Sequence, residues 1–541
     1  MATGKGLDPN TVKNIDWSLA LKRIAQDVRT DFIHAPHISV IYAQAGDALI
    51  EQVTGELKSG KFRSGEPVTV EVPKTFRVAV ADRRKGLLGP NYSRPGSILL
   101  PGDRLFYQAL ADEAVPVVDK ATDHERSFSH QLAYASSSAM FRSSRKCWND
   151  LQDANRTHAR AKSVKYVLRV DIANYFGSLN QHKLINVLGD RGYPGHLAAK
   201  LEEMLLGHTG ERNSRGILQG MYPSDLFGNF YLAPVDQFLK EDLHVPSARY
   251  VDDIYIFLDS IEASVDVVRK LIPMLRSYDL ILNEAKSKIL PAKTLLTEEP
   301  DLEELFDAAF DEAKKQLTDE EIQSEYGFQA EWDEDDVNDE KREELELAAT
   351  QALFDSIEDY PGSEENIERF CLPLFARARS DYAVDHVLKA FSERPSMSQI
   401  YVAYLAGFLQ YAEVKKFLAA TLRDSTTMDW QRMWVLAALM QADGPVNGAV
   451  KNSLALLESG KRHQTLRASA AIYVGRFGDH AARLKLGRLY SGQPLYVQLA
   501  IYYSSRNWPV VERRNAKSSW ADHSPLHDLL TTAVDVKLKK A

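Results

Sequence analysis

The stretch Tyr250-Val251-Asp252-Asp253 places two adjacent carboxylates between apolar segments. Residues 254–258 are Ile-Tyr-Ile-Phe-Leu, and β-branched and aromatic residues also come just before the pair. Such flanks predict two β-strands joined by a tight turn at the aspartates. Carboxylates held at a hairpin tip can bind hard divalent cations. An isolated Asp-Asp pair is more often a polar turn, so its meaning depends on what lies upstream.

A second apolar segment, residues 164–172, carries Asp171 at the end of a predicted strand. Alone it would be a strand-end carboxylate that caps a helix, but with Asp252 and Asp253 it completes a set of three. Phosphoryl transfer from a nucleoside triphosphate uses two divalent metal ions about 4 Å apart, which clamp the attacking and leaving oxygens. Because carboxylate oxygens suit Mg²⁺ or Mn²⁺, the three aspartates predict a two-metal site.

Strand and helix signals alternate between residues 164 and 290. Predicted helices are residues 181–188, 196–206, 224–239 and 261–275. Ser224 is the expected N-cap of the third helix, since it follows Pro223 and precedes an apolar run. Residues 280–289 form a short closing element. This order predicts an α+β sheet with helices packed on one face.

The charge of the chain is uneven. Its net charge is −9, but residues 298–346 hold 22 Asp plus Glu and 4 Lys plus Arg, a balance of −18, so the remainder is +9. A basic body with one acidic segment is compatible with a polyanionic partner, although a solvated surface explains it equally well. Two cysteines indicate a reducing cytoplasm. No apolar run reaches the roughly 18 residues of a membrane span, so no membrane partner is expected.

Residues 348–541 are predicted to be helical throughout. Their clearest unit is residues 463–490, in which two alanine- and leucine-rich segments flank Gly478-Asp479. Repeated helix–turn–helix units predict an α-solenoid similar to HEAT repeats. A compact helical bundle is the alternative.

Four motifs, taken in order, carry a resemblance to a known family. They are Asp-x-x-x-Tyr-Phe at 171–176, Gln-Gly with Pro-Ser at 219–224, Tyr-x-Asp-Asp at 250–253 and Leu-Asn-x-x-Lys-Ser at 282–287. This order resembles motifs A to D of reverse transcriptases. The resemblance implies the fingers and palm of a right-hand polymerase. It also implies an RNA-directed DNA polymerase, a nucleotidyltransferase that uses dNTPs and Mg²⁺ or Mn²⁺.

The same resemblance assigns the catalytic residues. Asp171 matches the first metal ligand, and the carbonyl of Ile172 would face the second metal. Asp252 and Asp253 match the remaining carboxylates. Lys286 would protonate the leaving pyrophosphate or screen its charge, and a solvated lysine is the alternative.

Nucleotide-binding residues follow by the same comparison. Arg94 would grip the triphosphate with its planar guanidinium. Phe176 matches the steric gate against the sugar, or is a core aromatic. Gln219 and Gly220 match the loop that packs on the incoming nucleotide, where Gly220 permits close backbone approach. Met221-Tyr222 stands where the family has small residues, which leaves contacts with a template open and fits a looser dependence on a template.

The chain after residue 290 restricts the resemblance to fewer classes of reverse transcriptase. No nuclease or maturase signature follows residue 290, and a palm followed by helical repeats resembles the abortive-infection (Abi) and unknown-group bacterial enzymes of antiphage defence. These enzymes form homo-oligomers. Some make single-stranded DNA without a template from a tyrosine of the protein, for which Tyr42 is the candidate here unless it is a core aromatic. Others copy a dedicated noncoding RNA.

Two other readings stay open. One is an RNA-templated enzyme that serves a retron or mobile element. The other is a helical-repeat scaffold with an inactive palm. The expected domains are the N-terminal region with the fingers (1–160), the palm (161–294), an acidic connecting segment (295–347) and the helical-repeat domain (348–541).

Overall fold

The computed structural model describes residues 6–74, 93–210, 213–296, 305–306, 309, 339–360, 362–520 and 524–538. The chain forms two compact units. The first comprises residues 1–70, 95–298 and 520–541, and the second comprises residues 71–94 and 299–519. This grouping differs from the expected ranges. The expected helical-repeat domain spans residues 348–541, whereas the second unit ends at Ser519 and residues 520–541 belong to the first unit. Within the first unit, the boundary expected between fingers and palm stays a prediction.

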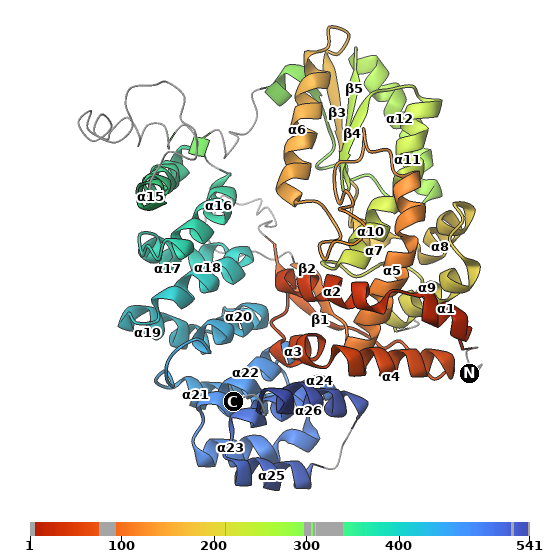
Figure 1. Ribbon diagram of the computed structural model, residues 1–541. Helices are drawn as coiled ribbons and strands as arrows, with labels where there is room; N and C mark the ends of the chain where they lie inside the picture. Colours follow the sequence, from red (N-terminus) through yellow and green to blue (C-terminus); the bar gives the residue numbers. More distant parts are fainter. Residues whose placement is uncertain are drawn as a thin grey trace. The chain divides into compact units, whose positions relative to one another are not determined.

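The first unit contains the sheet and most of the motifs (Figure 1). Its helices are α1 (Pro9–Asn14), α2 (Trp17–Asp27), α3 (Pro36–Gln44), α4 (Gly46–Lys58), α5 (Pro101–Ala121), α6 (Ser144–Arg160), α7 (Tyr175–Ser178), α8 (Gln181–Asp190), α9 (Gly195–His208), α10 (Tyr222–Tyr231), α11 (Ala233–Gln237), α12 (Ile261–Ser277) and α26 (Pro525–Leu538). Its strands are β3 (Tyr166–Val170), β4 (Ser247–Tyr250), β5 (Asp253–Leu258) and β6 (Lys288–Pro291). A separate two-stranded sheet joins β1 (Val68–Pro73) and β2 (Ser93–Ile98).

The four-stranded sheet has the order β4-β5-β3-β6, and each neighbouring pair is antiparallel. Tyr250 pairs with Asp253, so β4 and β5 form a tight hairpin around Val251-Asp252. The two strands predicted on either side of the aspartates are confirmed. The strand predicted before Asp171 is confirmed as β3, which ends one residue earlier.

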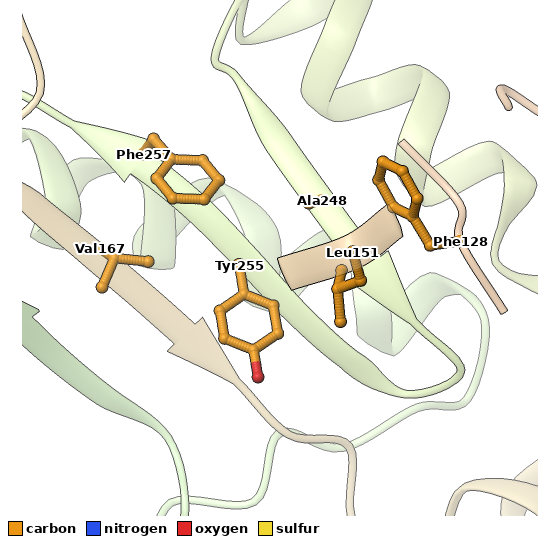
Figure 2. Packing of buried hydrophobic residues seen from close by; sticks show 6 residues of the cluster. All are labelled: Phe128, Leu151, Val167, Ala248, Tyr255 and Phe257. Carbon is orange, nitrogen blue, oxygen red and sulfur yellow. The ribbon is translucent and has the colours of Figure 1, made fainter. Parts of the chain in front are cut away.

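One face of this sheet is covered by α6. The core there consists of side chains from β3, β4, β5, α6 and the segment before α6, namely Phe128, Leu151, Val167, Ala248, Tyr255 and Phe257. Figure 2 shows Leu151 between Tyr255 and Phe128, close to Ala248. Helix α12 packs on β3 and β5 as well, and its Ile272 lines a hollow together with Leu168, which points to the face opposite Val167. The expectation of helices on one face only is therefore wrong, because α6 precedes the sheet and covers the second face.

Three of the four predicted helices are confirmed as α8, α9 and α12. The prediction for residues 224–239 is wrong. Helix α10 begins at Tyr222 and ends at Tyr231, and α11 and a π-helical turn, Phe238–Asp242, follow separately. Proline suits the first turn of a helix and breaks an interior, so Pro223 lies inside the start of α10 and Pro234 opens α11. Ser224 is not an N-cap: it is buried within the first turn, 3.2 Å from the Tyr107 hydroxyl.

In the described residues of the second unit, the regular structure beyond its parts of β1 and β2 is helical. Its α-helices are α15 (Asp339–Asp355), α16 (Glu364–Arg377), α17 (Val384–Glu393), α18 (Ser398–Leu405), α19 (Ala412–Thr421), α20 (Asp429–Leu439), α21 (Ala449–Glu458), α22 (Gln464–Phe477), α23 (His480–Arg488), α24 (Leu495–Ser504) and α25 (Val510–Ser519). The helix–turn–helix predicted around Gly478-Asp479 is confirmed as α22 and α23, with Asp479 as the N-cap of α23.

Alternate helices of this unit stack in chain order. α16 packs on α18, α18 on α20, α20 on α22 and α22 on α24. A succession of nearest-neighbour contacts is typical of a helical-repeat array and differs from a bundle around one core. Membership of the HEAT class stays a prediction. Most of the acidic connecting segment, residues 295–347, lies outside the described residues.

Among the described ranges, no helix combines the length and the apolar character that crossing a bilayer requires.

The last helix, α26, belongs to the first unit and packs against α3. Its buried side chains include Leu529, Leu530 and Ala533, and those of α3 include Ile38 and Ile41. A C-terminal segment thus completes the core around an N-terminal helix.

Leu530→Ala should therefore destabilise the first unit by about 2–5 kcal/mol, the usual cost of truncating a fully buried leucine. Thr532→Ala, on the exposed side of the same helix, should cost less than about 1 kcal/mol. Urea unfolding followed by tryptophan fluorescence would measure both. Equal effects of the two substitutions would show that α26 does not support the core.

Candidate active site

The sheet register brings the three predicted carboxylates together at one end of the two central strands, β3 and β5. Val170 of β3 pairs with Ile254 of β5 in an antiparallel register. The next residue after Val170 is Asp171, and the residue before Ile254 is Asp253, so these two aspartates face each other. Opposed residues of an antiparallel pair project to the same face of the sheet. Asp252 lies in the turn directly before Asp253. The predicted convergence of Asp171, Asp252 and Asp253 at a strand end and a hairpin tip is therefore what the backbone produces.

Asp171 is held on both sides by the segment that matches motif D. Its carboxylate accepts hydrogen bonds from Asn283 Nδ2 at 2.7 Å and from Lys286 Nζ at 3.2 Å. Its backbone is also fixed, because its carbonyl accepts from the Asn283 N–H at 2.8 Å and its own N–H donates to Ser287 Oγ at 3.2 Å. Lys286 is 58% exposed, so this ion pair is weak and easily opened.

Burial disfavours the charged forms of both hairpin carboxylates. Burial, followed by the neighbouring charges of Asp253 and Asp171, raises the pKa of Asp252 to about 6. Burial also raises the pKa of Asp253, against the opposing effect of the Arg169 guanidinium 3.6 Å away. Both ionised side chains are therefore held at a cost in free energy, which a bound cation would relieve.

The donor set fits a hard divalent cation. All three side chains are carboxylates, and their mutual repulsion is of the kind that Mg²⁺ neutralises. In the part of the chain that the structure describes, no three acidic, histidine or cysteine side chains lie close enough to coordinate one ion as they stand. Both oxygens of Asp171 accept a hydrogen bond, from Asn283 and from Lys286, so an ion would compete with these donors for the carboxylate. The role of the Ile172 carbonyl stays a prediction.

The predicted nucleotide loop takes up the conformation that its glycine allows. Gly220 has φ +79°, and a Cβ atom there would lie 2.4 Å from the ring of Phe32. Only glycine is compatible with both constraints. Gln219 is half-buried beside it. Phe176 is also half-buried, and its ring lies so close to Gly228 that a Cβ atom there would approach it to 2.7 Å. Phe176 therefore packs on helix α10, as its alternative role as a core aromatic predicts, and its role as a steric gate stays a prediction.

A buried ion cluster that the sequence did not reveal fixes the start of α10. Arg104 donates to Asp27 at 2.5 Å and to Asp31 at 3.2 Å, and all three side chains are buried. Asp27 also accepts from the N–H of Tyr222 at 3.0 Å, and Arg104 lies 3.9 Å from the sulfur of Met221. The only sequence signal was an arginine at the start of the apolar run of α5.

The contact with Arg104 shows which structural role Met221 has. Its side chain is 0% exposed and faces Arg104, so it is a core residue rather than a surface that meets a template. Tyr222 is half-buried and packs edge-on against Phe141. The replacement of a small residue by Met221 consequently gives no support to synthesis without a template.

The two remaining predicted residues are Tyr42, which lies near the Arg104 cluster, and Arg94. Tyr42 is 5% exposed on α3, and burial raises the pKa of its hydroxyl well above the usual range. This position matches its alternative role as a core aromatic and does not support a priming role. Arg94 lies on β2 and is grouped with the second unit. Its contact with a triphosphate stays a prediction.

Residues 112–304 match a protein-family model described as "Reverse transcriptase (RNA-dependent DNA polymerase)". This part of the chain is a reverse transcriptase domain. The match covers β3 to β6 and all four motifs, so the expected class, an RNA-directed DNA polymerase and nucleotidyltransferase, is confirmed for the domain.

Other comparisons add little. Solved structures of telomerase from Candida albicans with a fragment of telomeric RNA, and from Candida tropicalis with such a fragment, are 14% and 12% identical to the chain. Their TM-scores are 0.29 and 0.31, the alignments cover 66% and 70% of this chain, and the chain spans 66% and 64% of theirs. Likenesses this low establish no common fold. A comparison with curated proteins gave no match.

Asp252→Asn should stabilise the metal-free protein, with an effect that grows with pH. Because the folded-state pKa is raised to about 6, ionisation destabilises the folded state as pH rises from the unfolded pKa through this value. The gain in free energy of unfolding should be about 2 kcal/mol at pH 8 and roughly half of that at pH 5. Urea unfolding in EDTA measures it, and a gain independent of pH would contradict the argument.

Lys286→Met should lower the Mg²⁺ concentration needed for half-saturation by about two- to fivefold, since the lysine competes for Asp171 through an exposed ion pair. Lys288→Met, an exposed lysine on β6, is the matched control and should leave this concentration unchanged. Displacement of bound Mn²⁺ by added Mg²⁺, followed by electron paramagnetic resonance, would compare them. A higher half-saturation concentration in the Lys286 variant would instead make the lysine a supporter of the bound metal.

Proposed function

We propose that the protein polymerises dNTPs into DNA by two-metal phosphoryl transfer at Asp171, Asp252 and Asp253. One observation carries the proposal. In the antiparallel register, Asp171 lies opposite Asp253 at one end of the central strands, and Asp252 lies in the adjoining turn. The match of residues 112–304 to the reverse transcriptase model supports it independently.

The chemistry follows from the positions of the side chains. When bound, divalent cations would stabilise the charge on the attacking and leaving oxygens. Asp171, Asp252 and Asp253 would hold them. Lys286 Nζ, already 3.2 Å from Asp171, would be close enough to give a proton to the leaving pyrophosphate once the carboxylate turns to a cation. Gly220 would let the loop of motif B keep its backbone conformation against Phe32, which a larger residue would disturb.

RNA is the template that we favour. The family model is described as RNA-dependent, and the burial of Met221 removes one reason to expect synthesis without a template. A dedicated noncoding RNA or the RNA of a retron or mobile element would serve equally. Sequencing the DNA made by the purified protein with and without added RNA tests this. Products of the same sequence in both cases would favour template-independent synthesis.

Antiphage defence is the biological setting that we propose. It rests on the resemblance to Abi and unknown-group enzymes and on the stacked helices that follow the palm. Plating of phage on cells that express the wild type or Asp252→Asn tests it, and equal plating on both would exclude a role for synthesis in defence. Homo-oligomerisation, measured by light scattering, is part of the same proposal.

Asp171→Asn and Asp252→Asn should each lower dNTP incorporation by at least about 10³-fold, because each removes a charge that the transition state requires. Asp259→Asn is the matched control: this carboxylate lies at the other end of β5 and is exposed. Incorporation of labelled dNTPs with Mg²⁺ measures all three. Full activity of the first two variants would place the chemistry elsewhere and favour a scaffold with an inactive palm.

A further inference from the structure

The turn that carries Asp252 has a strained residue at its first position. Val251 has φ +54°, in the left-handed region that β-branched residues rarely adopt. Such a conformation persists only where surrounding contacts enforce it. Both backbone polar groups of Val251 are bound by side chains: its N–H donates to Ser129 Oγ at 2.8 Å, and its carbonyl accepts from Arg249 Nη1 at 2.9 Å.

Arg249 is itself fixed in the core. It is 1% exposed and forms a buried ion pair with Asp236, with Nη2–Oδ2 at 2.6 Å and Nε–Oδ1 at 2.9 Å. Its other donors reach Asn229 Oδ1 at 2.9 Å and Ser127 Oγ at 3.0 Å. A guanidinium held by several partners at once presents each N–H in a fixed direction. The bond to the Val251 carbonyl is therefore made by a rigid group.

Asn229, on α10, joins the two sides of this network. Its Oδ1 accepts from the hydroxyls of Ser127 at 3.1 Å and Ser129 at 3.0 Å, and its Nδ2 donates to the Ser129 carbonyl at 3.0 Å. The segment with both serines runs beside β4, where the Phe128 N–H donates to the Arg249 carbonyl at 2.9 Å. The catalytic hairpin is thus tied to α10 and to the chain that precedes α6.

We infer that Ser129 and Arg249 are positioning residues that hold Val251 in its left-handed conformation and so aim Asp252 and Asp253 at the site of metal binding. The inference rests on the proposed function. Neither side chain touches a reacting atom: both act through the backbone of the turn. A rigid turn matters because a displacement of catalytic groups by about 1 Å can lower a rate by about 10²-fold.

The two serines provide a matched pair of variants. Ser127 and Ser129 are both fully buried and both donate to Asn229 Oδ1, but only Ser129 binds Val251. Ser129→Ala should make the amide of Val251 exchange with solvent about three- to tenfold faster, as expected from the loss of one hydrogen bond. It should also lower kcat by about ten- to a hundredfold with little change in KM for dNTP. Ser127→Ala removes one of the several bonds that hold Arg249 and none that reaches Val251 directly, so it should change both quantities by less than Ser129→Ala does.

Relief of the strain gives a second test. Asparagine adopts the left-handed region more readily than valine does, whereas alanine does not relieve the strain. In the Val251→Asn background, Ser129→Ala should therefore lower kcat by less than it does in the wild type. In the Val251→Ala background the loss should remain. This coupling distinguishes control of the turn from a general loss of stability.

Hydrogen exchange of a peptide that contains Val251 separates this inference from the proposed function. If the wild type does not polymerise dNTPs, the proposed function fails, and the exchange comparison still tests whether Ser129 holds the turn. If Ser129→Ala and Ser127→Ala change exchange and kcat equally, the positioning role is overturned. Faster exchange at Val251 with unchanged kcat and unchanged Mg²⁺ dependence would also overturn it, because the turn would then move without effect on the site.

Discussion

Repulsion among three carboxylates at one edge of a small sheet is the constraint on which the first unit depends. Asp171 faces Asp253, and Asp252 adjoins it, so the unaided chain would move these groups apart. Different neighbours oppose that tendency. Asn283 and Lys286 bind Asp171, and Arg169 lies beside Asp253. These contacts are exposed or partly exposed, which lets them exchange for a cation without a large loss of folding free energy.

The backbone of the turn that carries Asp252 is held by buried groups, unlike the side chains of the carboxylates. Arg249, Asp236 and Asn229 are buried, and their polar groups bond to one another and to the turn. A buried ion pair is costly to break, because one partner would be left charged and unpaired. In the proposed site, firm support of the backbone combined with weak contacts to the side chains would let the carboxylates bind and release ions while the turn stays in place.

The sequence could predict this sheet and its carboxylates because both depend on local patterns. Apolar alternation around residues 250–253 specifies a hairpin, and the order of four motifs specifies how its elements follow one another. Helix α6 was not predicted, although its buried residues Cys147, Leu151, Asn155 and Ala159 recur at every fourth position. Only two of the four are strongly apolar, so the helical pattern is weak. The apolar pattern of residues 224–239 predicts one long helix with Pro234 in its interior, whereas the structure ends α10 before this proline and places it in the first turn of α11.

Contacts between distant segments could not be predicted from one sequence. Arg104 with Asp27, Arg249 with Ser127 and α26 with α3 each join residues whose charge or apolarity has many equivalent partners along the chain. The contact of Arg249 is nevertheless indicated in part by its own neighbours in the sequence. Arg249 lies directly before Tyr250 in a strand whose neighbour Ala248 is fully buried, and a buried arginine requires a carboxylate. That requirement identifies the need for a partner such as Asp236, but only the fold of α11 against β4 determines which carboxylate meets it.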